Sequence, residues 1–456
     1  MWVPTKPVEQ TQAPASPPAP APLPAPAPGP RVEVAPLPRV ETAPLPVPPS
    51  QSAALPPPTV SVSPPPRNSG PKEEVRAALL VPLSGPSAAL GAMLSNAAQL
   101  ALFEVADTHF NLIPLDTRGT PEGAAAAARL ALNQGADIVL GPLSSAEVMA
   151  AAPVVRDQGV PMVAFTTTKA ALGNGVYSTG FLPGSQVRRV VAQARADGRQ
   201  RFAVLAPDNA YGRAMVEEYK AAVVESGAAM GRIEYYDPAV ADPTPVAKRF
   251  ADYERRRGEL EREKKALAGR GGSQAMLAEL EKAAAGRTLA FDAVLLPDEG
   301  VRLKSVASLI TYYGIDPGPV RLLGTMAWDD PRLVDEPSLQ GGWFPAPPEA
   351  AHAAFEARYV KAFGPLPPRM GNFASAAYDS AALAATLARQ GQGDFPPSAL
   401  TNPGGFTGID GIFRLRPDGT SERALAVREM VRGGAHEIGP APTSFDAPAA
   451  LPPVGR

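Results

Sequence analysis

The sequence predicts an α/β fold with two lobes, each a doubly wound parallel sheet with helices on both faces. Short apolar runs alternate with amphipathic segments along most of the chain, which is the pattern of buried parallel strands joined by crossover helices. The alternation breaks at Pro183-Gly184 and then restarts, which indicates a second lobe. Polar turns follow the apolar runs, at the strand ends where open α/β sheets place their ligand sites.

The two ends of the chain differ in composition from the rest. Of the 56 prolines, 24 lie in the first 71 residues. Proline at this density removes amide donors and favours an extended polyproline-II chain. We therefore expect residues 1–72 to form a disordered Pro-rich tether and residues 437–456 a disordered tail. For the first segment, a proline-motif ligand of a partner domain is the alternative.

Composition and motifs argue against several functions. The chain has no cysteine, three scattered histidines and a formal net charge of −2, so we expect no metal site, no cofactor and no nucleic-acid partner. No Gly-x-Ser-x-Gly elbow is present, and neither a P-loop nor a Gly-x-Gly-x-x-Gly motif follows a strand. We therefore expect a protein that is not an enzyme.

Neither an apolar run of transmembrane length nor a signal peptide is evident. The first residues, Met1-Trp-Val-Pro-Thr-Lys, lack the apolar region of an export signal. A long tether suits a domain that is anchored to a surface. Either the protein is cytosolic, or the sequence starts downstream of a removed or unrecorded export segment; the tether favours the exported, anchored protein, whose lipid anchor would not be in this chain.

The first lobe is expected from residues 73–183 and 347–400. It opens with the apolar stretch 75–86, in which a strand ends at a Pro, Ser and Gly turn. Ser144 stands three residues before Glu147, which is the spacing of a helical capping box. The expected strands are 75–81, 110–116, 137–142, 161–165 and 176–181, and the expected helices are 87–107, 121–134, 144–158, 349–363 and 372–389.

The second lobe is expected from residues 184–346 and 401–436, so that the chain crosses between lobes near 183, 346 and 400. Its expected strands are 201–207, 233–236, 291–297 and 320–325, and its expected helices are 185–196, 208–225 and 301–313. The glycine-punctuated strand 406–419 is expected to form a hairpin with residues 424–431.

Residues 245–288 are too many for a simple crossover, and we predict a helical hairpin inserted in the second lobe. A thin apolar stripe marks its first helix, and Gly269-Arg-Gly-Gly272 marks the turn. The stripe residues are Val246, Phe250, Tyr253, Leu260 and Leu267. Either the hairpin is a solvated arm that packs on itself, or it is a docking arm for a protein partner.

Polar residues gather in the turns after the predicted strands, and the two lobes are expected to enclose them in a cleft. Hydroxyl groups there either cap helices or contact a ligand. The expected cleft residues are Ser84, Gly85, Ser144, Ser145, Thr166, Thr167, Tyr211, Asp298 and Trp328.

The chain resembles the type I periplasmic binding fold of branched-chain amino-acid receptors. The resemblance covers roughly residues 73–435. It rests on five marks in this order: Leu80-Val-Pro-Leu-Ser-Gly85, Gly141-Pro-Leu-Ser-Ser145, Asp208-Asn-Ala-Tyr-Gly212, Ala377-Tyr-Asp379, and Phe406-Thr-Gly-x-x-Gly411 with Asp418-Gly419.

Within that superfamily, the sequence is most similar to the penicillin-binding protein activators of alphaproteobacteria. The segments that suggest this are Phe291-Asp-Ala-Val-Leu-Leu-Pro-Asp298, Val320-Arg-Leu-Leu-Gly-Thr325, Trp328-Asp-Asp330 and Gly341-Gly-Trp-Phe-x-Ala-Pro347. The resemblance implies a periplasmic regulator of peptidoglycan synthesis that is tethered to the outer membrane. Its implied partner is a bifunctional penicillin-binding protein, with the hairpin 245–288 as the candidate contact. Enterobacterial activators carry a helical-repeat domain before this fold, and we recognise no such repeat in these residues.

The alternative is a solute receptor of an ABC importer for branched-chain or related amino acids. In such receptors the turns equivalent to Ser144–Ser145 and Thr166–Thr168 hold the α-carboxylate and α-amino groups, and an acid from the second lobe completes the ammonium site. Here the turn after Thr325 carries Trp328, which would fill the cleft or stack on a sugar ring, and Asp298 is the substitute acid.

Overall fold

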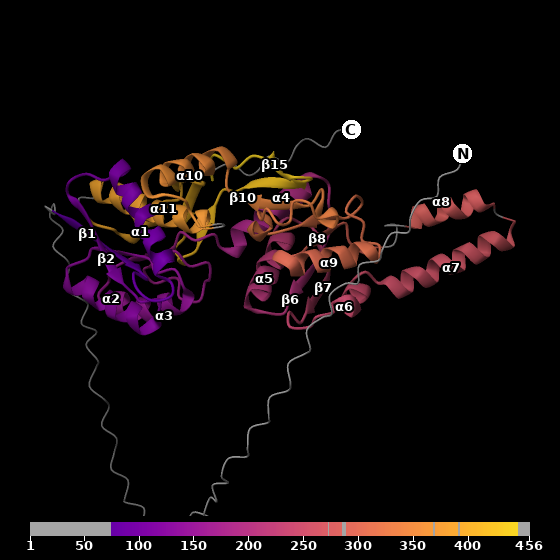
Figure 1. Ribbon diagram of the computed structural model, residues 1–456, viewed down its shortest axis with the longest axis horizontal. Helices are drawn as coiled ribbons and strands as arrows, with labels where there is room; N and C mark the ends of the chain where they lie inside the picture. The colour runs from indigo at the N-terminus through magenta and orange to yellow at the C-terminus, as the bar shows by residue number, and fades with distance from the viewer. Residues whose placement is uncertain (1–73, 272, 285–288, 368–369, 391–392, 446–456) are drawn as a thin grey trace, which may run out of the picture. The chain divides into compact units, whose positions relative to one another are not determined.

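The computed structural model describes residues 74–445, apart from 272, 285–288, 368–369 and 391–392. The expectations for residues 1–72 and 446–456 therefore lie outside the described residues. Two larger sheets and one small sheet carry the fold (Figure 1). The expectation of an α/β fold with parallel sheets is confirmed by this architecture.

The first sheet has five parallel strands in the order β2-β1-β3-β4-β5. Its strands are β1 (Val75–Val81), β2 (Phe110–Asp116), β3 (Ile138–Leu140), β4 (Met162–Ala164) and β5 (Val176–Ser178). Strand β5 ends at Ser178, earlier than the predicted 181, because Thr179 and Gly180 already belong to the crossing toward the second sheet.

Helices cover both faces of this sheet. Its helices are α1 (Ala88–Val105), α2 (Pro121–Asn133), α3 (Ser145–Arg156), α10 (Glu349–Phe363) and α11 (Gly371–Gln390). In β1, Ala77 and Leu79 pack in one core with α1 and α11, while Ala78 and Leu80 pack in another with α2 and α3. Alternate residues of a strand point to opposite faces, so both faces of β1 are apolar.

Helix α1 is the one helix among the described residues that is long and apolar enough to span a membrane. Eight of its residues are buried, and it packs against α11 in the core of the first sheet. Its apolar character is therefore explained by its place in the core.

The second sheet has seven strands in the order β15-β14-β10-β9-β8-β6-β7. The five neighbouring strands β7, β6, β8, β9 and β10 are parallel to one another. Strands β14 and β15 add antiparallel pairs beyond β10, at one edge of the sheet. The strands are β6 (Arg201–Pro207), β7 (Ala229–Tyr236), β8 (Ala293–Leu295), β9 (Arg321–Leu323), β10 (Trp343–Ala346), β14 (Ala426–Val431) and β15 (Gly434–Gly439).

Helices again cover both faces. Helices α4 (Pro183–Ala196) and α5 (Ala210–Glu225) pack on one face, and α6 (Thr244–Phe250) and α9 (Gly300–Tyr312) pack on the other. Short helices complete the chain: η1 (Met326–Trp328), η2 (Pro337–Leu339) and α12 (Pro397–Leu400).

The predicted hairpin between 406–419 and 424–431 is wrong. The small sheet pairs β11 (Phe406–Gly408) with β12 (Gly411–Leu415) and β12 with β13 (Ser421–Arg423), all antiparallel. The turn closes at Thr420, whose carbonyl accepts from the Arg416 amide at 2.8 Å, and Gly419 has a φ of +83°. Pairing therefore begins at Ser421, and the following segment is free to join the second sheet as β14.

Strand β15 runs to Gly439, so the first residues of the predicted disordered tail are part of the second sheet. Its apolar contacts are few, Ala435 and Ile438, and its otherwise polar or glycine sequence does not show the pattern of a strand.

The expected single helix from 246 to 267 is two helices. Val246 and Phe250 lie on α6 and are buried in the core of the second sheet, while α7 (Tyr253–Gly269) has no buried residue. Asp252 between them has a φ of +52°, which redirects the chain. Helix α8 (Gln274–Ala284) returns beside α7, and the two form the helical arm (Figure 1).

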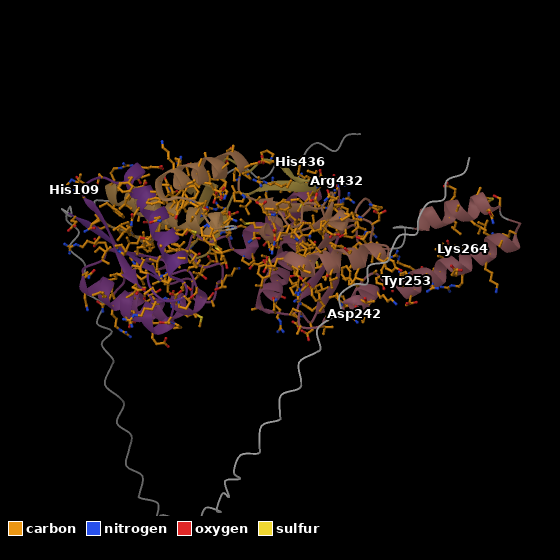
Figure 2. The ribbon with its side chains drawn as sticks, viewed as in Figure 1. His109, Asp242, Tyr253, Lys264, Arg432 and His436 are labelled. Carbon is orange, nitrogen blue, oxygen red and sulfur yellow. The ribbon has the colours of Figure 1, made fainter. Side chains whose placement is uncertain are left out.

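The base of this arm is anchored by Arg256. Its guanidinium donates to the carbonyls of Ala251 at 2.9 Å, Tyr313 at 3.3 Å and Gly314 at 3.0 Å. Tyr253 also packs against Tyr313, with ring centroids 5.0 Å apart. Figure 2 shows Tyr253 at the base and Lys264 further along α7.

Candidate functional site

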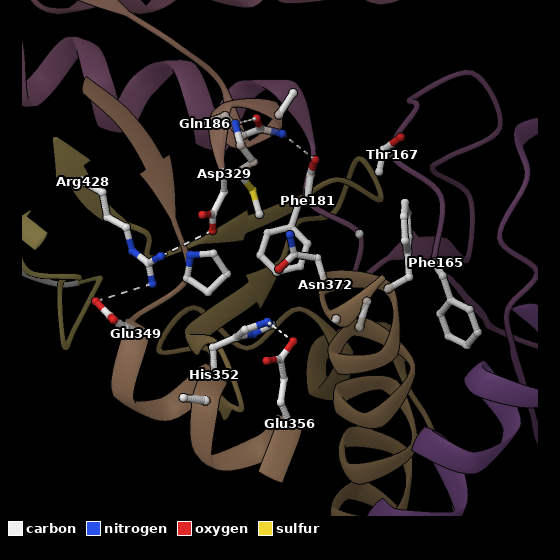
Figure 3. Close-up of a pocket in the computed structure, with 18 of the residues that line it drawn as sticks. Phe165, Thr167, Phe181, Gln186, Asp329, Glu349, His352, Glu356, Asn372 and Arg428 are labelled. Carbon is white, nitrogen blue, oxygen red and sulfur yellow. Dashed lines mark hydrogen bonds and ion pairs between the residues drawn. The ribbon is translucent and has the colours of Figure 1, made fainter. Parts of the chain in front are cut away.

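A cavity of about 520 Å³ lies where the ends of β4 and β9 approach α10, α11 and the crossing before α4. Its apolar wall comes mainly from three aromatic rings and Met326, and its polar wall contains charged groups of both signs (Figure 3). The polar and charged lining residues are Thr167, Gln186, Asp329, Glu349, His352, Glu356, Asn372 and Arg428. This mixture of an apolar wall and a few polar groups is typical of small-molecule sites.

The apolar wall is fixed by the fold. Phe165 follows β4 directly and is fully buried, and Phe181 lies on the crossing that follows β5. Phe373 stands near the start of α11. Because these rings come from a sheet end, a crossing and a helix start, the chain must be folded before they face one cavity.

Arg428, on β14, crosses the polar wall. Its guanidinium lies 3.4 Å from a carboxylate oxygen of Asp329 and 4.0 Å from one of Glu349 (Figure 3). The Arg428 side chain is only 13% exposed, whereas those of Asp329 and Glu349 are 45% and 62% exposed. The arginine is thus held between two carboxylates at the cavity rim.

His352, on α10, connects the cavity to a buried carboxylate. Its Nδ1 lies 2.6 Å from Asp410, which is fully buried, and its Nε2 lies 3.5 Å from Glu356. Ser375 also donates to Asp410. Burial lowers the pKa of His352, but the hydrogen bond and charge of Asp410 and the charge of Glu356 outweigh it, so the pKa is raised.

A second buried carboxylate, Asp379, belongs to an ion pair with Arg423 at 2.8 Å, and both side chains are fully buried. Burial raises the pKa of Asp379 to about 6, although the Arg423 charge acts in the opposite direction. Arg423 also donates to the carbonyl of Thr179 at 2.8 Å and lies 4.5 Å from the ring centre of Phe181. This ion pair therefore ties α11 and β13 to the first crossing.

Of the nine expected site residues, Thr167 lines this cavity. Ser145 and Thr166 lie together, but their hydroxyls are engaged: Ser145 bonds Thr168 at 2.7 Å and approaches Thr166 at 3.4 Å. Thr166 is 1% exposed. The hydroxyl groups of these turns therefore bond one another.

Ser144 caps α3, as its spacing to Glu147 predicts. Its hydroxyl accepts from the Glu147 amide at 3.3 Å and donates to the Glu147 carboxylate at 2.6 Å. Thr117 donates to the same carboxylate at 2.5 Å, and Glu147 is 3% exposed. The positive end of the α3 dipole is thus next to a buried glutamate of this chain.

Ser84 and Gly85 lie away from the residues that line the cavity. The Ser84 hydroxyl donates to Asp116 at 2.5 Å, and the amides of Leu83 and Ser84 donate to the other oxygen of that carboxylate. Gly85 has a φ of +80°, which explains glycine there. Both residues shape the turn after β1.

The second-sheet candidates also have structural partners. The Tyr211 hydroxyl donates to Thr325 at 2.9 Å, and the Tyr236 hydroxyl donates to Asp298. Burial raises the pKa of Asp298. Asp298 lines a separate cavity of about 420 Å³, together with Glu299, Arg302 and Arg332.

The expectation that Trp328 fills the cleft or stacks on a sugar ring is wrong. Trp328 is fully buried, and its Nε1 donates to the carbonyl of Leu296 at 3.1 Å. Gly324 and Gly342 make room for the indole, because a Cβ on either would lie 2.1 Å or 2.6 Å from it. The next residue, Asp329, is the acid that faces the cavity, so the second sheet does supply one.

Sequence reasoning did not select the charged residues His352, Glu356 and Arg428. His352 and Glu356 show helical spacing on α10, which reads as an ordinary charged face. Arg428 lies in the strand that was assigned to the wrong hairpin. Among the described residues, no group of His, Asp and Glu is arranged to hold a metal ion.

Comparison with known proteins agrees with this architecture. Residues 74–254 match the family model described as periplasmic binding protein. A Leu/Ile/Val-binding protein, BraC3, of Rhizobium johnstonii is 28% identical over 167 residues, which are 34% of this chain and 45% of that relative. The match thus spans less than half the length of this curated relative.

Solved structures match over a larger part of the chain. A protein from Rhodospirillum rubrum described as a branched-chain amino acid ABC transporter has a TM-score of 0.63 at 18% identity, over 80% of this chain and all of its own. A solute-binding protein from Rhodopseudomonas palustris, solved with dihydroxybenzoic acid, has a TM-score of 0.54 at 19% identity, over 82% of this chain and 98% of its own.

These structural matches show the fold, and the order of the strands in the two larger sheets agrees with it. The resemblance to the penicillin-binding protein activators is finer than these matches and stays a prediction. The chain therefore has an α/β type I periplasmic binding fold with parallel sheets.

Proposed function

We propose that this chain is a non-enzymatic, periplasmic binding protein that holds a small solute in the cavity beside Phe181 and His352. The observation that carries the proposal is the cavity itself: about 520 Å³, with walls from both sheets and from the crossing between them. Related proteins with this fold include one solved with an aromatic acid, and the family name itself implies a periplasmic location.

A thermal-shift screen tests this function. A solute at 100 times its dissociation constant stabilises the folded protein by about 2.7 kcal/mol and therefore raises Tm. We expect at least one member of a panel of amino acids, amines, carboxylic acids and muropeptides to do so. A flat response across the panel would contradict solute binding.

A matched pair of variants locates the binding. Ala353 lines the cavity, and its neighbour Ala354 on α10 is exposed and does not line it. Ala353→Trp fills the cavity and should abolish the shift in Tm, while Ala354→Trp should leave it unchanged. Equal responses from the two variants would place the solute elsewhere.

A second function is favoured by the helical arm. Helix α7 buries none of its residues, and neither α7 nor α8 contributes to the cavity. Solute binding therefore gives no reason for the arm. We propose that the arm contacts a bifunctional penicillin-binding protein, as the resemblance to activators implies, and that the chain regulates peptidoglycan synthesis from an outer-membrane tether.

Binding of a purified class A penicillin-binding protein tests this second function. Replacing residues 253–288 by a short Gly-Ser linker should weaken that binding, measured by surface plasmon resonance. The Ala353→Trp variant serves as control, because it alters the cavity and leaves the arm intact. If the linker variant bound the penicillin-binding protein as strongly as the parent chain does, the arm would be a solvated extension without this contact.

A further inference from the structure

We propose that the solute carries a net positive charge and that its ammonium group binds between Asp329 and Glu356. This inference rests on the proposed function, because it concerns the occupant of the same cavity. It starts from the charges that face the cavity and from the hydrogen-bond partners that each of them already has.

The cavity has more carboxylates than cations. Asp329, Glu349 and Glu356 line it, and the buried Asp410 stands directly behind His352. Against these four carboxylates there are two cationic groups, Arg428 and His352, even when the histidine is protonated. A cationic solute would compensate this excess, whereas an anionic solute would increase it.

Both cationic groups already have carboxylates of this chain beside them. Arg428 has Asp329 and Glu349 at the two ends of its guanidinium, and its Nε is enclosed by protein. His352 has Asp410 on Nδ1 and Glu356 near Nε2. A carboxylate on the solute would therefore compete with carboxylates of this chain for either cation.

The N-terminus of α3 is also compensated by groups of this chain. The first turn of α3 holds the Glu147 carboxylate, which accepts from Thr117 and Ser144. The hydroxyls of Ser145 and Thr168 are bonded to each other at 2.7 Å. The helix dipole and these hydroxyls therefore already have partners.

The acidic groups, by contrast, have unused capacity. A carboxylate accepts several hydrogen bonds. Glu356 has one approach from His352, at 3.5 Å, and its side chain is 46% exposed. Asp329 has Arg428 at 3.4 Å and is 45% exposed. The rings of Phe165, Phe181 and Phe373 give the adjacent wall on which a hydrocarbon stem would pack.

A series of four-carbon probes separates charge from size. Putrescine has two ammonium groups, γ-aminobutyrate has one ammonium and one carboxylate, and succinate has two carboxylates. By isothermal titration calorimetry with the full chain, we expect putrescine to bind best and succinate worst. Affinity for putrescine should fall as salt is added, because the acidic rim is exposed to solvent.

Charge-neutralising variants test the two residues named. Asp329→Asn and Glu356→Gln should each weaken putrescine binding by about fivefold to tenfold, which corresponds to about 1–1.4 kcal/mol, and should have less effect on γ-aminobutyrate. Glu263→Gln on α7 is the matched control, since Glu263 is exposed and far along the chain from the cavity.

The outcomes distinguish this inference from the function on which it rests. If γ-aminobutyrate, succinate or a neutral amino acid binds better than putrescine and Ala353→Trp abolishes that binding, the charge inference is overturned while solute binding stands. Binding of putrescine that both rim variants leave unchanged also overturns it. If no probe and no amino acid binds at all, the proposed function fails together with this inference.

Discussion

The ion pair of Asp379 with Arg423 and the ion pairs along α7 use the same residue types in opposite surroundings. Both side chains of the first pair are fully buried, and Arg423 also bonds the Thr179 carbonyl. On α7, Arg255 lies 2.8 Å from Glu259, but these side chains are 47% and 33% exposed. Water competes for the second pair and is excluded from the first.

This difference in exposure determines how much each ion pair contributes to the stability of the fold. A buried charge that loses its partner retains the full cost of leaving water, whereas an exposed charge is rehydrated. The buried pair also lies at the meeting point of α11, β13 and the crossing before α4, next to the cavity. We therefore expect stability to depend on this pair far more than on the arm.

The largest expected effect is that of Asp379→Ala. It leaves Arg423 buried without its carboxylate, and we expect a loss of about 3–5 kcal/mol in the free energy of unfolding. Urea denaturation followed by circular dichroism measures it. Asp157→Ala, at an exposed site after α3, is the control and should stay close to the parent protein.

A double variant sharpens the result. Asp379→Ala combined with Arg423→Met removes both charges, so the double variant should be more stable than Asp379→Ala alone. A loss below about 1 kcal/mol for Asp379→Ala would mean that the buried pair is no more important than a surface pair.

The sequence was sufficient to predict the layers of the fold, because strands buried on both faces are apolar throughout. The run Ala77-Ala-Leu-Leu-Val81 is such a strand, and it serves two cores. The capping of α3 by Ser144 was equally predictable, because it depends on residues three positions apart. For this strand and this helix cap, the local pattern was enough to predict the local structure.

The site was less predictable because its residues meet only in the folded chain. Strand alternation does not tell whether Trp328 or Asp329 faces the cavity; the space that receives the indole depends on the distant Gly342. Similarly, the charge and orientation of His352 depend on its contact with Asp410, and the buried charge of Asp379 depends on its ion pair with Arg423. The segments that contribute these pairs are 58 and 44 residues apart.

The second prediction concerns pH, since two groups beside the cavity have raised pKa values. The pKa of His352 is raised by Asp410 and Glu356, with Asp329 also contributing, against the opposing effect of burial. The stability it contributes is fully present below its unfolded pKa of about 6.5 and is lost as pH rises through the folded pKa.

Asp379 acts in the same direction. Burial raises its pKa to about 6 from an ordinary value of 3.8, so its protonated form is favoured in the fold and stability falls as pH rises between these values. We therefore expect Tm to decline as pH is raised from about 5 to about 8. His352→Gln should flatten the upper part of this decline, measured by differential scanning calorimetry.

His109→Gln is the control for this measurement, because His109 is exposed on the loop before β2. It should preserve the pH dependence of Tm. A His352→Gln profile parallel to that of the parent protein would remove His352 from the explanation.

The smallest expected effect comes from a pair of neighbours at the base of the arm. The ion pairs of Arg255 with Asp252 and Glu259 are open to solvent, so Arg255→Ala should leave Tm within the scatter of replicate scans. Arg256 donates to three backbone carbonyls, and Arg256→Ala should cost about 1–3 kcal/mol because those acceptors lose a charged donor. Differential scanning calorimetry compares the two variants under one condition. Equal losses of stability in the two variants would show that burial of the partner groups does not decide how much a charged side chain contributes. The contrast drawn above between the buried ion pair and the exposed pairs of the arm would then be wrong.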